Sequence, residues 1–193
     1  MIMKKRKVIL VLFFLFFSAI SYAQSVRIYV LGGGNIDFIF NSMSSYTNGI
    51  TYQDWTVIGM TITDPTATYT TWDLKVEAQD PDADGFITGS NPINKIPFST
   101  IELSAKVTAG CVKCKVIFPG PSPFNLALPA PGAGVALVDG SKLGMPEFPP
   151  YLNFATDEIA VSYYCGTTAA NNLLGKAPDY YTDIIQFTLT MYP

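Results

Sequence analysis

Apolar and polar residues alternate along much of this chain, and the alternation predicts β-strands. Trp72, Leu74 and Val76 fall on one face of a run whose other face is polar. Side chains two residues apart point the same way on a strand, so this run is typical of a half-buried strand. This run spans Tyr69–Glu77. Further runs predicted to be strands are Val26–Leu31, Asn35–Phe40, Trp55–Thr63, Ser99–Val107, Glu158–Cys165 and Thr182–Tyr192. The pattern predicts no amphipathic helix.

The alternation also assigns the faces of the longer runs. In the final run, Ile185, Phe187, Leu189 and Met191 share one face, and Gln186, Thr188 and Thr190 share the other. Ile101, Leu103, Ala105 and Val107 are expected to point inward in the run over Ser99–Val107. Each of these runs is therefore predicted to bury one face against a core.

Stretches rich in proline and glycine separate the runs and are expected to be loops. The longest are Pro119–Gly134 and Gly144–Tyr151, whose prolines argue against central strands. About seven strands joined by such loops predict an all-β fold, an antiparallel β-sandwich that is immunoglobulin-like in a loose sense. We expect a single domain over residues 24–193, because no repeat or second boundary interrupts it.

The first 23 residues have the organisation of a cleavable secretory signal peptide. Lys4–Lys7 supplies a positive segment, Val8–Ile20 is almost purely apolar, and Ser21 and Ala23 provide small residues for signal peptidase. The alternative is an uncleaved membrane anchor, but a spanning helix needs about 20 apolar residues. We therefore expect a secreted or cell-surface protein (periplasm or outer surface of a bacterium) with no transmembrane segment after signal cleavage.

Charge and composition exclude several classes of function. Removing the four basic residues of the signal from the chain's 12 leaves eight basic against 15 acidic residues, a net charge of −7. Such a chain is a poor partner for nucleic acid. It also contains no His, which excludes Ser-His-Asp and Cys-His catalysis and His-bearing zinc sites. Catalysis by a pair of carboxylates, as in glycoside hydrolysis, stays open, but no signature marks such a pair, and the adjacent Asp157 and Glu158 would face opposite ways on a strand. We therefore expect no enzyme activity.

Three cysteines, Cys111, Cys114 and Cys165, are expected to form one structural disulfide after export. A bond from Cys165 to Cys111 or Cys114 is favoured, because closing a loop of about 50 residues gives about 4 kcal/mol in the chain-entropy model. A local Cys111–Cys114 bond is the alternative. Tyr163, two residues before Cys165, has the spacing of a tyrosine corner, and Trp72 is a candidate core tryptophan.

An aspartate-rich segment offers a candidate metal site. Asp80, Asp82 and Asp84 alternate and are followed by Gly85, as in loops whose carboxylates converge on Ca²⁺ while a glycine lets the chain turn back. Asn91 stands where such a loop usually carries a bidentate Glu. A plain hairpin turn without metal is the alternative, so Ca²⁺ is a possible cofactor and no other is expected.

Three tyrosines near proline- or aspartate-rich loops are candidate ligand-stacking residues. Tyr151, Tyr180 and Tyr181 carry aromatic rings that can stack on the apolar faces of sugars. The alternative is that these rings pack in the core or within loops.

The end of the chain, Tyr181–Pro193, is similar to the closing strand of spore coat protein U-type and pilin-like secreted subunits. It has a Tyr-x-Asp segment, then alternating apolar and Thr residues, and an aromatic residue near the end. The resemblance implies an immunoglobulin-like subunit that assembles by adding strands between chains. Val26–Leu31 is then either a donated strand or the first strand of its own fold.

These observations predict an exported, non-enzymatic structural or adhesion subunit of the bacterial cell surface. The alternative is a calcium-stabilised extracellular carbohydrate-binding module. The expected partners are accordingly other protein subunits or surface glycans.

Overall fold

The computed structural model describes residues 25–63, 71–79, 84–109, 115–116, 123–125, 134–139 and 158–192. The predicted signal peptide lies outside these residues, as do Asp80, Asp82, Cys111, Cys114 and Tyr151. The strands are β1 (Ser25–Gly32), β2 (Ile50–Thr63), β3 (Thr71–Ala78), β4 (Phe86–Thr88), β5 (Lys95–Pro97), β6 (Ile101–Ala109), β7 (Lys115–Val116), β8 (Phe124–Asn125), β9 (Val135–Asp139), β10 (Glu158–Cys165) and β11 (Ile185–Tyr192). Helix α2 spans Met43–Asn48, and the 3₁₀ turn η1 spans Phe98–Thr100.

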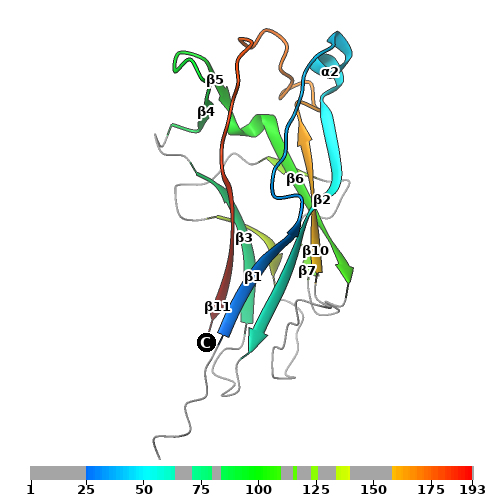
Figure 1. Cartoon of the computed structure of the whole chain (residues 1–193), viewed down its shortest axis with the longest axis vertical. Helices are drawn as coiled ribbons and strands as arrows, with labels where there is room; N and C mark the ends of the chain where they lie inside the picture. The colour runs from blue at the N-terminus through cyan, green and yellow to red at the C-terminus, as the bar shows by residue number, and fades with distance from the viewer. Residues whose placement is uncertain are drawn as a thin grey trace, which may run out of the picture.

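Two antiparallel sheets make up most of the fold, which confirms the predicted all-β class. The five-stranded sheet has the order β1-β2-β10-β6-β8, and the four-stranded sheet has the order β11-β3-β9-β7. A third, small sheet is the hairpin β4–β5. Strands β1 and β11 are edge strands of different sheets, and they lie near each other along one side of the molecule (Figure 1).

The two sheets pack face to face through one cluster of buried apolar side chains. Ile58 and Met60 of β2 and Leu74 and Val76 of β3 are fully buried in it. Trp72 is buried as well, as the alternation predicts. The inward faces expected for β3 and β11 are those that contact the core, although the β11 residues are only partly buried. Burial of this kind is the main favourable contribution to folding.

The expected strand over Asn35–Phe40 is absent, and this segment has no regular secondary structure. Its apolar residues Ile36, Phe38 and Phe40 still pack against the core. Side chains of β2 take the place of a neighbouring strand, because Trp55 Nε1 donates to the Asn35 carbonyl at 2.8 Å and the Tyr52 hydroxyl donates to the Asp37 carbonyl at 2.9 Å. The predicted strand is therefore wrong, although the apolar residues of the segment are partly buried.

Helix α2 is a second difference from the predicted elements. Ser42 caps its N-terminus: the Ser42 hydroxyl accepts from the Ser45 amide, and the Ser45 hydroxyl accepts from the Ser42 amide, each at 3.2 Å. This reciprocal pattern satisfies two amides that have no partner within the helix. Six residues are too few for a helical apolar stripe, so hydrophobic periodicity does not reveal the helix.

No helix among the residues that the structure describes is long and apolar enough to cross a membrane.

Candidate functional site

The outer edge of β11 is a long strand edge without a described neighbour. Strand β11 pairs with β3 in unbroken register from Ile185 opposite Ala78 to Tyr192 opposite Thr71. Among the described strands it has no neighbour on its other side. An edge strand presents a row of N–H and C=O groups that can pair with another chain. We call this row, over Ile185–Tyr192, the β11 edge.

The β11 edge lacks three of the features by which edge strands avoid pairing. No charged residue occurs from Ile184 to Tyr192, and no bulge or proline interrupts the strand. Charges, prolines and bulges are the common protections of exposed edges. The β11 edge is therefore a regular and uncharged template for a further strand.

Polar contacts fix the end of β11 to β3. The Tyr192 hydroxyl donates to Asp73 Oδ2 at 2.9 Å and accepts from Lys75 Nζ at 3.0 Å. The pKa of Lys75 is raised, chiefly because its ammonium group donates to the Tyr192 hydroxyl. These contacts are made to residues of β3, so they hold the strand in register without using the β11 edge.

Strand β1 forms the neighbouring edge, and it is less regular. It pairs with β2 in the five-stranded sheet, with a register shift between Val30 and Gly32. Val26–Leu31 is thus the first strand of its own fold in this structure, one of the two arrangements expected. Val30 is 55% exposed and Arg27 is exposed as well, so this edge carries both apolar surface and a charge.

The predicted metal-binding segment is described only in part. Asp84 Oδ2 forms an ion pair with Lys95 Nζ, and Asp84 Oδ1 accepts from the Phe86 amide at 3.0 Å. The pKa of Asp84 is lowered, chiefly by the hydrogen bond from Lys95. Gly85 has φ +80°, as the expected tight turn requires. Asp84 thus contributes to the β4–β5 hairpin, and Ca²⁺ binding stays a prediction.

The structure separates the two described candidate tyrosines. Tyr181 packs against the core, and its hydroxyl donates to the Ala177 carbonyl at 2.8 Å. Tyr180 is 70% exposed. Its backbone is fixed, because its amide donates to Asp179 Oδ1 at 2.7 Å and its carbonyl accepts from the Ser90 amide at 3.0 Å. Of these two rings, only that of Tyr180 lies open to a ligand.

Cys165 ends β10 and is buried as a free thiol. Burial raises the pKa of this thiol to about 12, which keeps it protonated at neutral pH. Its two candidate disulfide partners lie outside the described residues, so the disulfide remains a prediction. Tyr163 does not form a tyrosine corner, because its hydroxyl donates to the Thr56 side chain at 2.9 Å rather than to a nearby main-chain group.

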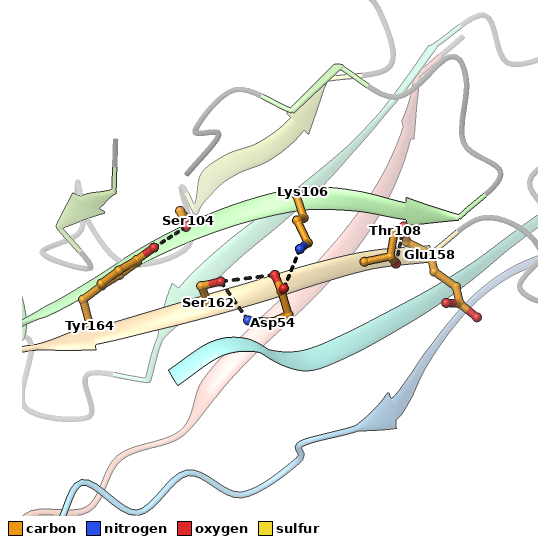
Figure 2. A network of polar contacts seen from close by, with 7 residues as sticks. All are labelled: Asp54, Ser104, Lys106, Thr108, Glu158, Ser162 and Tyr164. Atoms are coloured by element: carbon orange, nitrogen blue, oxygen red, sulfur yellow. Dashed lines mark hydrogen bonds and ion pairs between the residues drawn. The ribbon is translucent and has the colours of Figure 1, made fainter. Parts of the chain in front are cut away.

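A polar network that sequence patterns did not predict lies across β2, β10 and β6 (Figure 2). Asp54 is at its centre: Asp54 Oδ2 pairs with Lys106 Nζ, and the Asp54 amide donates to the Ser162 hydroxyl at 2.9 Å. In the same network the Tyr164 and Ser104 hydroxyls lie 3.1 Å apart. The network joins three strands that are far apart in sequence, so no local motif marks it.

Comparison with known proteins gives no family for this chain. A scan against protein-family models finds no match, and a search of curated proteins finds none either. The function is therefore argued from the geometry described above.

Proposed function

We propose that this protein is an exported, non-enzymatic structural or adhesion subunit of the bacterial cell surface that assembles by pairing of edge strands. The observation that carries the proposal is the β11 edge, eight residues long, without charge, proline or bulge. Strand addition at such an edge gives affinity through main-chain hydrogen bonds and specificity through alternate side chains. The predicted signal peptide and the similarity of Tyr181–Pro193 to pilin-like closing strands support the same function.

The partly buried core face of β11 supports this proposal further. Phe187 and Leu189 contact the core, but neither is among its fully buried residues. The facing residues of β3, Leu74 and Val76, are fully buried. A strand added to the β11 edge would cover the remaining apolar surface, and each Å² removed from water contributes about 25 cal/mol.

The first test places lysines on the β11 edge. Gln186→Lys and Thr190→Lys put the new charges opposite Glu77 and Asp73 of β3, so pairing within the chain is preserved. We expect the exported protein, purified after expression of the full chain, to form species larger than a monomer by light scattering and electron microscopy. The double variant should be a folded monomer, because an added strand would have to approach two charges.

A matched control adds the same charge outside the β11 edge. Gln53→Lys and Thr108→Lys change exposed residues of β2 and β6, strands that belong to the other sheet. The control protein should assemble like the original one. A purified exported protein that stays monomeric at every concentration, or assembly that the edge lysines leave intact, would refute the proposal.

The exposed ring of Tyr180 favours a second candidate function, glycan binding. Its fixed backbone and open ring suit stacking against a sugar, which an aromatic surface can bind without charge. A glycan array probed in calcium and then in chelator tests this function together with the predicted calcium loop. Binding that Tyr180→Ala abolishes and Tyr151→Ala or Tyr181→Phe leaves intact is the expected result; no bound glycan would reject this candidate.

A further inference from the structure

We propose that the partner of the β11 edge is the β11 edge of a second copy, paired antiparallel about a two-fold axis. This inference rests on the proposed function and specifies its partner. The result would be a continuous sheet made from two of the four-stranded sheets. Interfaces of this kind are self-complementary, because the same surface is used on both subunits.

Charge is the first argument for self-pairing. In a two-fold antiparallel pair, a residue near the axis meets its own copy, and like charges directly opposite each other are destabilising. The segment from Ile184 to Tyr192 carries no charge. The described edge strands β1 and β7, in contrast, carry Arg27 and Lys115. Among the long edge strands that the structure describes, β11 is thus the one that can pair with a copy of itself without repulsion between like charges.

Side-chain pattern is the second argument. Gln186, Thr188 and Thr190 lie on one face of β11, and pairing about Thr188 places Gln186 opposite Thr190 of the second copy while Thr188 meets itself. Hydrogen-bonding and β-branched pairs of this kind stabilise antiparallel strands. On the other face, Phe187 would meet Leu189 of the second copy. Both residues are only partly buried in one chain, so pairing would join the two cores.

Regularity is the third argument. The β11–β3 register runs without a shift over all eight residues, so the outer N–H and C=O groups follow one even antiparallel pattern. Strand β1 has a register shift near its end, which bends a strand and disrupts the ladder. A long and even edge gives two copies the largest number of hydrogen bonds.

Disulfide trapping tests both the partner and the direction of pairing. Directly opposite residues have Cβ atoms about 4.5–5.5 Å apart, close to the reach of a disulfide. Three single variants, Thr188→Cys, Gln186→Cys and Thr190→Cys, are oxidised in the exported full-chain protein. The bridged peptides are then identified by mass spectrometry without reduction.

We expect Thr188→Cys to cross-link with itself in high yield. Gln186→Cys and Thr190→Cys should each give little self-linked product, but a mixture of the two should give the heterodisulfide. Self-linked products from both Gln186→Cys and Thr190→Cys, without the heterodisulfide, would show parallel pairing and overturn the inference. Gln53→Cys serves as the control for random collision and should give no specific bridge.

The outcomes also separate this inference from the function on which it rests. If the protein assembles and the edge lysines abolish assembly, yet no bridge joins two β11 strands, then another strand occupies the edge. In that case two-fold pairing is wrong and the subunit function stands. If the protein never assembles, the subunit function itself fails.

Discussion

Asp54 has the most unusual backbone in the described part of the chain. Its φ of 51° is the only positive value among the non-glycine residues that the structure describes. The value coincides with a break in the β10–β2 register, where Val161 faces Thr56 but Tyr163 faces Tyr52. Asp and Asn tolerate this left-handed conformation better than other residues. The bulge therefore explains why an aspartate occupies this position of β2.

We expect Asp54→Ala to lower the free energy of unfolding by about 1–2 kcal/mol, since alanine adopts this conformation at a cost and also loses the ion pair to Lys106. Asp54→Asn keeps the tolerated backbone and should cost less than about 1 kcal/mol. Urea unfolding of both variants and of Lys106→Ala gives the comparison. If Asp54→Ala costs no more than Lys106→Ala, backbone strain is not the cause.

At the scale of elements, one carboxylate binds the turn of the β4–β5 hairpin from outside it. Asp179 Oδ2 accepts from the Asn91 amide and from Asn94 Nδ2, each at 3.0 Å. A bridge between Gly89 and Tyr181 adds a main-chain contact nearby. The pKa of Asp179 is lowered, with the hydrogen bond from Asn94 as its largest cause. This residue thus couples a small sheet to the segment that precedes β11.

Acid should loosen this attachment. Because the pKa of Asp179 is lower in the folded than in the unfolded state, its stabilising effect is present above the ordinary value of about 3.9 and is lost as pH falls below it. We expect the protection of the Asn91 amide against exchange, relative to the intrinsic rate at each pH, to fall in that range, and Asp179→Asn should remove most of this pH dependence.

Asp84 titrates in the same hairpin, so a local probe must separate the two carboxylates. The Phe86 amide, which donates to Asp84, reports on that residue. If Asp84→Asn abolishes the pH-dependent change at Asn91 and Asp179→Asn does not, then Asp84 causes the change. That result would contradict the prediction for Asp179.

Elements with a buried face could be predicted from the sequence, and elements held by other means could not. The predicted run Glu158–Cys165 coincides with β10, which is buried on both faces, and the inward face of β3 was correct. Val107 of β6, expected to point inward, is exposed. In Asn35–Phe40 the same alternation occurs without a strand, because side chains of Tyr52 and Trp55 bind its carbonyl groups. Periodicity reports burial, and it contains no information about which groups satisfy the backbone.

At the scale of the whole molecule, the candidate site depends on which strands become neighbours. The alternation in Thr182–Tyr192 predicts its apolar face, but not that β11 pairs with β3 alone among the described strands. That arrangement requires contacts between residues far apart in sequence. The same holds for Tyr180 and Tyr181, adjacent residues of one type, of which only the first is widely exposed. Strand order and solvent access are properties of the assembled sheets.

Among the described strands, β11 offers the one long edge suited to self-pairing, and this sets the valency of the proposed assembly. A two-fold contact occupies the β11 edges of both chains. This contact alone therefore produces a dimer, and dimer formation needs no nucleation step. Growth into a filament would require a second contact, and the exposed apolar residues of β1, such as Val30, are one described surface that could supply it.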